Sequence, residues 1–148
     1  MAGRREVPKY NKDGARAKKN AVQYECQVCS AWVGSTQVVV DHIKPVISVT
    51  DGFVDWNVFV DRLFCDKSNL QRICDTCHDK KTYDEKVSRL VLNDLQEYNI
   101  FSMKAPVDKK EAKDFVKKYT PKRLAKYPYP QSFVDSINDL KRFVKSKV

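Results

Sequence analysis

The segment Cys74–Thr82, CDTCHDKKT, sets the framework of this chain, because it places a histidine directly after a C-x2-C pair. A second pair, Cys26 and Cys29, lies upstream, with 44 residues between the two pairs. Thiolates and imidazoles are both metal ligands, so His78 is either a further ligand of the same ion or has another role. Two pairs at this spacing favour a tetrahedral metal site over a redox pair or buried free thiols. We therefore predict a structural zinc that clamps the two ends of a larger unit.

His78 is expected to lie on a helix that opens near the second cysteine pair. Consecutive helical residues point to different faces, so the Cys77 thiol faces the zinc while the His78 imidazole faces away from it. If four thiolates close the zinc shell, His78 is free for a different function. The fifth cysteine, Cys65, matches neither pair and is interpreted as a core residue.

The other histidine of the chain lies near the end of the β-branched run TQVVVDHI, residues 36–43, which reads as a strand. Asp41 and His42 are neighbours there, so their side chains point to opposite faces. A carboxylate is a hard oxygen ligand suited to magnesium or manganese, and a histidine can act as a general base near neutral pH. The two histidines therefore lie in two separate motifs, with Asn69 between them.

These motifs together resemble a known family. The pattern C-x2-C, D-H-I-x-P, N-L-Q and C-x2-C-H-x2-K resembles HNH nucleases of the ββα-metal class in their zinc-clamped form, over about residues 22–90. The stretch from Gly52 to Glu85 is also similar to small stand-alone HNH proteins of bacteriophages. The resemblance implies an α+β fold, with a small ββα-metal core and a structural four-cysteine zinc site flanked by additional helices.

The resemblance also implies a metal-dependent DNA endonuclease that hydrolyses phosphodiester bonds by nicking or double-strand cleavage. In that family pattern His42 is the general base, Asn69 orients the loop and the base, and Asp41 and His78 hold a catalytic Mg²⁺ or Mn²⁺. The base must be neutral, so activity is expected to fall below about pH 6.5. The structural zinc ligands are Cys26, Cys29, Cys74 and Cys77.

Charge is distributed unevenly along the chain. The net charge is +9, divided as +4 over residues 1–40, −3 over residues 41–100 and +8 over residues 101–148. This pattern favours a chain whose two basic end segments bind a polyanion and whose acidic middle segment binds a cation. The alternative is that the lysine-rich helices serve solubility alone. The candidate DNA contacts are Lys44, Arg72, Lys80, Lys81, Lys117, Lys118, Lys122 and Arg123.

We expect three segments: a basic N-terminal arm (1–20) with a short helix near residues 15–20, a nuclease domain with zinc knuckles (21–99), and a basic helical extension that contacts DNA (100–148). One helix is predicted within residues 54–64, and a capping box at Thr82 predicts a second that runs to about residue 98. A second capping box at Asp108 and a cap at Ser132 each predict the start of a further helix. Tyr119, Tyr127 and Tyr129 are interleaved with lysines; we predict that they pack in the core.

The chain has no apolar run of membrane-spanning length and no secretory signal pattern. We therefore expect a cytoplasmic protein of a phage-infected or bacterial cell, with double-stranded DNA as its partner. The sequence leaves open whether it is a monomer or a homodimer. Within the nuclease hypothesis it is a homing endonuclease, or a low-specificity or packaging-associated phage nuclease. Two further hypotheses stay open, an RNA-cleaving member of the family and a non-catalytic, zinc-dependent nucleic-acid-binding module.

Overall fold

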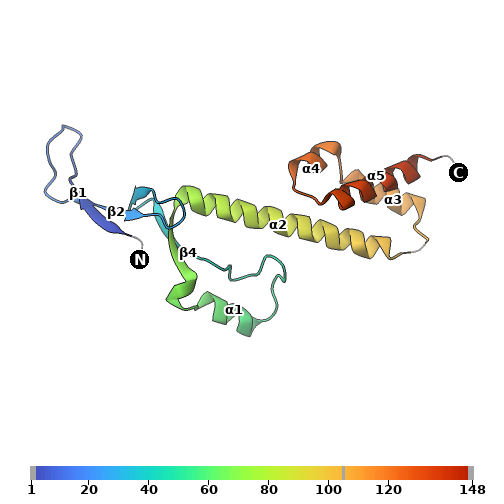
Figure 1. The fold of residues 1–148 in the computed structure, drawn as a ribbon, viewed down its shortest axis with the longest axis horizontal. Coiled ribbons are helices and arrows are strands. Elements are labelled where there is room, and N and C mark those ends of the chain that lie inside the picture. The colour runs from blue at the N-terminus through green and yellow to red at the C-terminus, as the bar shows by residue number, and fades with distance from the viewer. Residues whose placement is uncertain (1–2, 105, 147–148) are drawn as a thin grey trace. The chain divides into compact units, whose positions relative to one another are not determined.

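The computed structural model describes residues 3–104 and 106–146, and it has a mixed α and β architecture (Figure 1). The chain divides into two compact units, Met1–Glu85 (unit 1) and Lys86–Val148 (unit 2). Helix α2 (Asp75–Ser102) begins in unit 1 and ends in unit 2. The division therefore differs from the three predicted segments, because the N-terminal residues belong to unit 1 and the boundary falls within a continuous helix.

The first sheet of unit 1 includes the N-terminal segment that the sequence predicts to be a separate arm. Strands β1 (Arg4–Val7), β2 (Ala21–Glu25) and β3 (Trp32–Gly34) pair antiparallel in that order. The helix predicted near residues 15–20 does not form in this described part of the chain. Instead the chain turns at Gly14, whose φ is +83°, and returns to the sheet as a hairpin arm. Residues 15–17 thus pair with residues 9–11 across the arm, in place of a local helix.

The second sheet contains the predicted strand. Strands β4 (Val38–His42) and β5 (Leu70–Cys74) pair antiparallel, with Val39 opposite Ile73 and Asp41 opposite Gln71. Because side chains alternate between the faces of a strand, Asp41 shares a face with Val39 and Ile73. Ile73 is fully buried and Val39 packs against it, so this face is directed inward.

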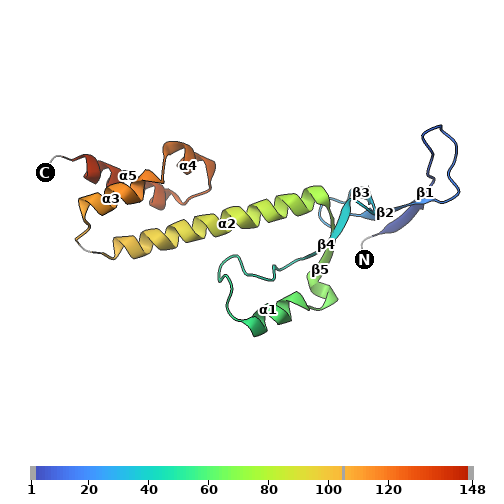
Figure 2. The same cartoon turned by 180° about the vertical axis from the view of Figure 1, so that it is seen from behind.

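The chain between the two strands forms an excursion that contains the predicted helix (Figure 2). Helix α1 (Trp56–Leu63) begins after Asp55, whose carboxylate caps it by accepting from the Val58 N–H at 2.9 Å. A short 3₁₀ turn, η1 (Lys67–Asn69), then leads directly into β5.

Helix α2 opens at the second cysteine pair, as the sequence predicts, and one continuous helix replaces the separate start predicted at Thr82. The predicted start at Thr82 is wrong, because the helix starts at Asp75, directly after β5, and passes through Thr82 without a break. No glycine or proline interrupts residues 75–102, and Asp75 lies in the first turn, where a negative charge favours the helix dipole. The start at Asp75 places Cys77 and His78 within the helix.

Unit 2 is helical. Helix α3 (Lys109–Lys117) is capped by Asp108 as predicted, and Thr120 caps the additional helix α4 (Pro121–Lys126). Helix α5 (Gln131–Lys145) begins after Pro130, so Ser132 lies in its first turn and the predicted Ser132 cap is wrong.

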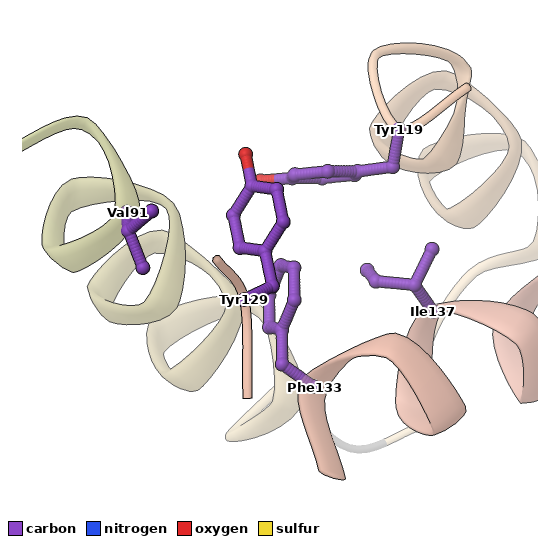
Figure 3. Close-up of a cluster of buried hydrophobic side chains, with 5 residues drawn as sticks. All are labelled: Val91, Tyr119, Tyr129, Phe133 and Ile137. Carbon is purple, nitrogen blue, oxygen red and sulfur yellow. The ribbon is translucent and has the colours of Figure 1, made fainter. Parts of the chain in front are cut away.

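The two units have very different cores. The buried cluster of unit 2 contains large apolar side chains, and the rings of Tyr129 and Phe133 stack at a centroid distance of 5.0 Å (Figure 3). Tyr119 and Tyr129 are buried there, as predicted. In the described part of unit 1, the buried residues are only Cys26, Ile73 and Cys74. Such a small apolar core leaves unit 1 dependent on another source of stability.

Among residues 3–104 and 106–146, no helix combines the length and the apolar character that crossing a bilayer requires.

Candidate functional site

The four predicted zinc ligands converge in unit 1. The sulfur atoms of Cys26, Cys29, Cys74 and Cys77 all lie within 4.8 Å of one another, and those of Cys29 and Cys74 are 3.8 Å apart. Zinc–sulfur bonds of about 2.3 Å in a tetrahedron imply sulfur–sulfur separations of about 3.8 Å. The cluster therefore has the size of a four-thiolate zinc site, and these cysteines can hold a structural zinc.

Local backbone geometry presents the first cysteine pair. The turn after Cys26 closes with the Ser30 N–H donating to the Cys26 carbonyl at 2.9 Å, and Ser30 adopts a φ of +60°. Burial would raise the pKa of the Cys26 thiol, but hydrogen bonds from the N–H groups of Cys29, Cys74 and Val28 lower that pKa to about 6. A thiolate at neutral pH is the form that binds zinc.

A salt bridge joins the end of β4 to helix α2. The Lys81 ammonium donates to Asp41 Oδ2 at 2.7 Å and to the His42 carbonyl at 2.6 Å, and it pairs with Glu85 at 3.2 Å. Burial would raise the pKa of Asp41, but the hydrogen bond and charge of Lys81 lower it below its usual range. Asp41 is therefore an anion at neutral pH, and its strand end is fixed to the helix.

The same salt bridge defines which face of α2 lies against β4. His78, Lys81 and Glu85 are spaced at i, i+3 and i+7, so they share one helical face. Lys81 contacts Asp41 from this face of α2. His78 is on the same face, one helical turn before Lys81. The half-buried His78 imidazole has no hydrogen-bond partner among residues 3–104 and 106–146. It is therefore available as a ligand, while the neighbouring Cys77 belongs to the sulfur cluster.

The His42 ring contacts the end of α1. Its Nε2 atom lies 3.3 Å from the Leu63 carbonyl oxygen. A carbonyl can only accept, so this contact requires a proton on Nε2 and leaves the lone pair on Nδ1. The carbonyl is among the last of the helix, where such groups have no intrahelical partner. Helix α1 thus fixes both the orientation and the tautomer of the neutral ring.

Asn69 supports the loop after β4. Its side chain accepts from the Lys44 N–H at 2.9 Å and donates to the Lys44 carbonyl at 3.2 Å, while its own carbonyl accepts from the Ile43 N–H at 2.8 Å. These bonds fix the backbone immediately after His42. The Asn69 side chain orients the loop in this way and does not bond to the His42 ring.

The candidate DNA contacts near the motifs fall into two groups. Lys81 is bound to Asp41, and the guanidinium of Arg72 lies over the Tyr24 ring at 4.7 Å, so both are held by the protein itself. Lys44 and Lys80 are exposed.

The candidates in unit 2 divide in the same way. The Arg123 guanidinium donates to the buried Asp94 carboxylate at 2.8 Å, and Asp94 also accepts from the Tyr129 hydroxyl. Lys117 and Lys118 form surface ion pairs with Asp114 and Glu97. Lys122 is exposed and lines a shallow hollow with Lys118 and Arg123.

Sequence reasoning missed two groups that the structure places in the site. The first is the Leu63 carbonyl, which no residue pattern could reveal because any residue has a carbonyl. The second is the ion-pair role of Lys81, although its spacing to Glu85 (i, i+4) was a usable signal. Cys65, predicted to be a core residue, is half-buried and lines a hollow of about 500 Å³ with Lys44 and Asn69.

Comparison with protein-family models, with curated proteins and with solved structures produced no match to this chain.

Proposed function

We propose that unit 1 is the catalytic unit of a metal-dependent DNA endonuclease of the HNH type, with β4, β5 and the start of α2 as its ββα-metal core. One observation carries the proposal: Lys81 ties the strand end that bears Asp41 and His42 to the α2 face that bears His78. The four-cysteine cluster at the junction of β5 and α2 supports it, because a zinc there would hold these elements in place.

The donor set fits a catalytic divalent cation. Asp41 uses the same carboxylate oxygen, Oδ2, for its side-chain hydrogen bonds to Lys81 and Gln71, which leaves Oδ1 for a cation. His78 would supply an imidazole nitrogen from α2. A carboxylate with a single imidazole suits Mg²⁺ or Mn²⁺ and leaves positions for phosphate oxygens. When bound, the cation would neutralise charge on the scissile phosphate and on the leaving oxygen.

Other residues of the chain would accept the proton of the attacking water, position the base and contact the phosphates. His42 takes the proton of the attacking water on Nδ1, because the Leu63 carbonyl holds the proton on Nε2. Asn69 keeps the loop after His42 in place, so that the base stays aimed at the phosphate. Lys44 and Lys80 are the candidate phosphate contacts, since both are exposed and each lies two positions after a motif histidine.

The partner we propose is double-stranded DNA. The charge of residues 101–148, net +8, supports a polyanion, and sequence-independent phosphate contacts supply most of such binding. Site-specific cleavage, as by a homing endonuclease, and low-specificity or packaging-associated cleavage use the same chemistry at this centre. We propose that the protein acts in the cytoplasm of a phage-infected or bacterial cell.

One observation favours a second candidate function. The Asp41 carboxylate is already paired with Lys81, as a purely structural aspartate would be. The alternative is therefore a zinc-dependent nucleic-acid-binding module that does not cleave. Such a module would bind DNA with an affinity independent of magnesium or manganese.

The test is relaxation of a supercoiled plasmid by the zinc-loaded chain in Mg²⁺ or Mn²⁺, with and without a chelator. The wild type is expected to nick only with added cation, while His42→Ala should bind DNA with unchanged affinity and fail to cleave. The matched control is Thr36→Ala, at an exposed uncharged residue of the turn before β4, which should cleave at the wild-type rate. Equal cleavage by wild type and His42→Ala would refute the assignment of the base.

A further inference from the structure

The hairpin arm, residues 8–20, concentrates positive charge on an exposed hairpin of unit 1 (Figure 1). Every residue of the arm except Ala17 is exposed. The arm carries five basic residues and one acidic residue, Asp13, so its net charge is +4. Within residues 3–104 and 106–146, no ion pair neutralises these five cations, which are Lys9, Lys12, Arg16, Lys18 and Lys19. Such a cluster of unpaired cations attracts a polyanion.

Backbone hydrogen bonds make the tip of the arm an ordered two-stranded ribbon. The Asn11 N–H donates to the Ala15 carbonyl at 2.8 Å, and the Ala17 N–H donates to the Lys9 carbonyl at 2.8 Å. The Asp13 carboxylate accepts from the Ala15 N–H at 3.0 Å, so the one acid of the arm serves the turn. The cations therefore stand on a fixed frame, and a binding partner would have little chain to order.

The tip of the arm combines cations with an aromatic ring. Tyr10 lies directly opposite Arg16, and the two strand hydrogen bonds flank this pair. Their side chains therefore share one face of the ribbon, at the closer of the two antiparallel spacings. Tyr10 is 63% exposed, and the exposed Lys12 follows in the turn. An exposed ring beside cations suits a surface that contacts sugars and phosphates.

The base of the arm presents two further cations. Between the Tyr10–Arg16 pair and the last pair of the β1–β2 sheet, the returning strand is two residues longer than the outgoing strand. The extra residues bulge where the chain bends at Lys18 and Lys19, and both of these side chains are exposed. A bulge redirects side chains away from the regular alternation of a strand. The arm thus carries cations at both its tip and its base.

The dimensions of the ribbon decide which polyanion fits it. Paired strands lie about 4.8 Å apart, and a two-stranded ribbon fits the major groove of DNA, about 12 Å wide, but not the minor groove, about 6 Å wide. The outgoing strand, residues 8–12, is about 16 Å long at about 3.3 Å per residue, which exceeds the groove depth of about 8.5 Å. The major groove of duplex RNA is too narrow for side chains to read.

We propose that the hairpin arm inserts into the major groove of double-stranded DNA. Lys12 and Arg16 contact phosphates near the tip of the arm, and Lys18 and Lys19 contact phosphates near its base. This inference rests on DNA as the proposed partner. Strand β2 leads from the arm directly to Cys26 of the sulfur cluster, so the arm would anchor the same unit that carries the proposed catalytic residues.

The test is the salt dependence of binding to a labelled DNA duplex of about 20 base pairs. Fluorescence anisotropy is measured with the zinc-loaded full chain and no added Mg²⁺ or Mn²⁺. Each phosphate contact adds about 0.9 to the slope of log affinity against log salt. Lys12→Ala and Arg16→Ala should therefore each lower the slope by about 0.9. Each should also weaken binding by about 8-fold at about 0.1 M salt, relative to about 1 M salt.

The matched control is Lys67→Ala. Lys67 is also an exposed cation of unit 1, but it follows residues 51–66, which carry four aspartates and one arginine. Its replacement should leave both the slope and the affinity unchanged. Because Lys12 and Arg16 are exposed, the arm variants should keep their zinc and their circular dichroism spectrum.

Duplex RNA of the same sequence separates groove insertion from simple charge attraction. The arm substitutions should change RNA affinity by less than about twofold, because the arm does not enter the RNA groove. Equal losses on RNA and DNA, or arm variants that bind DNA with the wild-type slope, would overturn the proposal.

The plasmid assay distinguishes this inference from the proposed nuclease. Arm-dependent DNA binding by a chain that never cleaves would refute the nuclease and keep the arm. Cleavage by a chain whose DNA affinity is unchanged by both arm substitutions would refute the arm and keep the nuclease.

Discussion

Replacing Lys81 by methionine tests the contact that joins the end of β4 to α2. The Lys81 and Asp41 side chains are 26% and 16% exposed, so their ion pair is largely shielded from water. Exposed pairs contribute about 0–1 kcal/mol, whereas breaking a fully buried pair costs about 3–5 kcal/mol. We therefore expect Lys81→Met to lower the free energy of unfolding of unit 1 by about 2 kcal/mol, an intermediate value.

The pH dependence of this effect follows from Asp41. Its pKa is lowered in the folded state, so the stabilisation is complete above the ordinary carboxyl pKa of about 3.9 and is lost only as the pH falls through the lower folded value. The difference between wild type and Lys81→Met should therefore be the same at pH 5.5 and at pH 7.5.

The assay is urea unfolding of zinc-loaded protein followed by tryptophan fluorescence, because both tryptophans, Trp32 and Trp56, lie in unit 1. Lys80→Met is the matched control, since Lys80 is the exposed neighbour and its loss should change stability by less than about 0.5 kcal/mol. A double-mutant cycle with Asp41→Asn should give a coupling energy of about 1–2 kcal/mol. Equal effects of the two lysine substitutions, or an additive cycle, would refute the reasoning.

Three further predictions concern zinc, Arg123 and Asn69. Removing zinc with a chelator, or replacing Cys74 by serine, should unfold unit 1 because its apolar core is so small, while circular dichroism should still report the helices of unit 2. Arg123→Ala should cost unit 2 about 3 kcal/mol in thermal or urea unfolding, because it leaves the buried Asp94 carboxylate unpaired, whereas Lys122→Ala should be nearly neutral. Asn69→Ala should slow plasmid nicking by about tenfold with DNA affinity within twofold of wild type, because the loop after His42 loses two hydrogen bonds.

The local signals in the sequence predicted the elements that carry the motifs. The β-branched run before Asp41 forms β4, the apolar spacing after Val54 forms α1, and the two C-x2-C pairs meet in one cluster. These features depend on residue type and spacing, which are visible in the chain itself.

The features that sequence reasoning missed depend on long-range contacts. Strand β1 forms because it pairs with β2, although its own residues, RREV, carry no clear alternation of apolar and polar side chains. The capping box at Thr82 is overridden because α2 already begins at Asp75, directly after β5. In the site, the Lys81–Asp41 pair spans 40 positions, and the carbonyl that holds His42 belongs to the backbone.

The central claim is that unit 1 uses two different metal ions, and the variant His78→Ala tests it most directly. Two quantities are measured on the purified variant: its zinc content and its cation-dependent nicking rate. Cys77 belongs to the sulfur cluster, and we assign the adjacent His78 to a second, catalytic cation. We therefore expect the variant to keep one zinc per chain and wild-type unfolding behaviour, with nicking in Mn²⁺ reduced by about 100-fold or more. A variant that loses its zinc and unfolds, or one that nicks at the wild-type rate, would contradict this assignment.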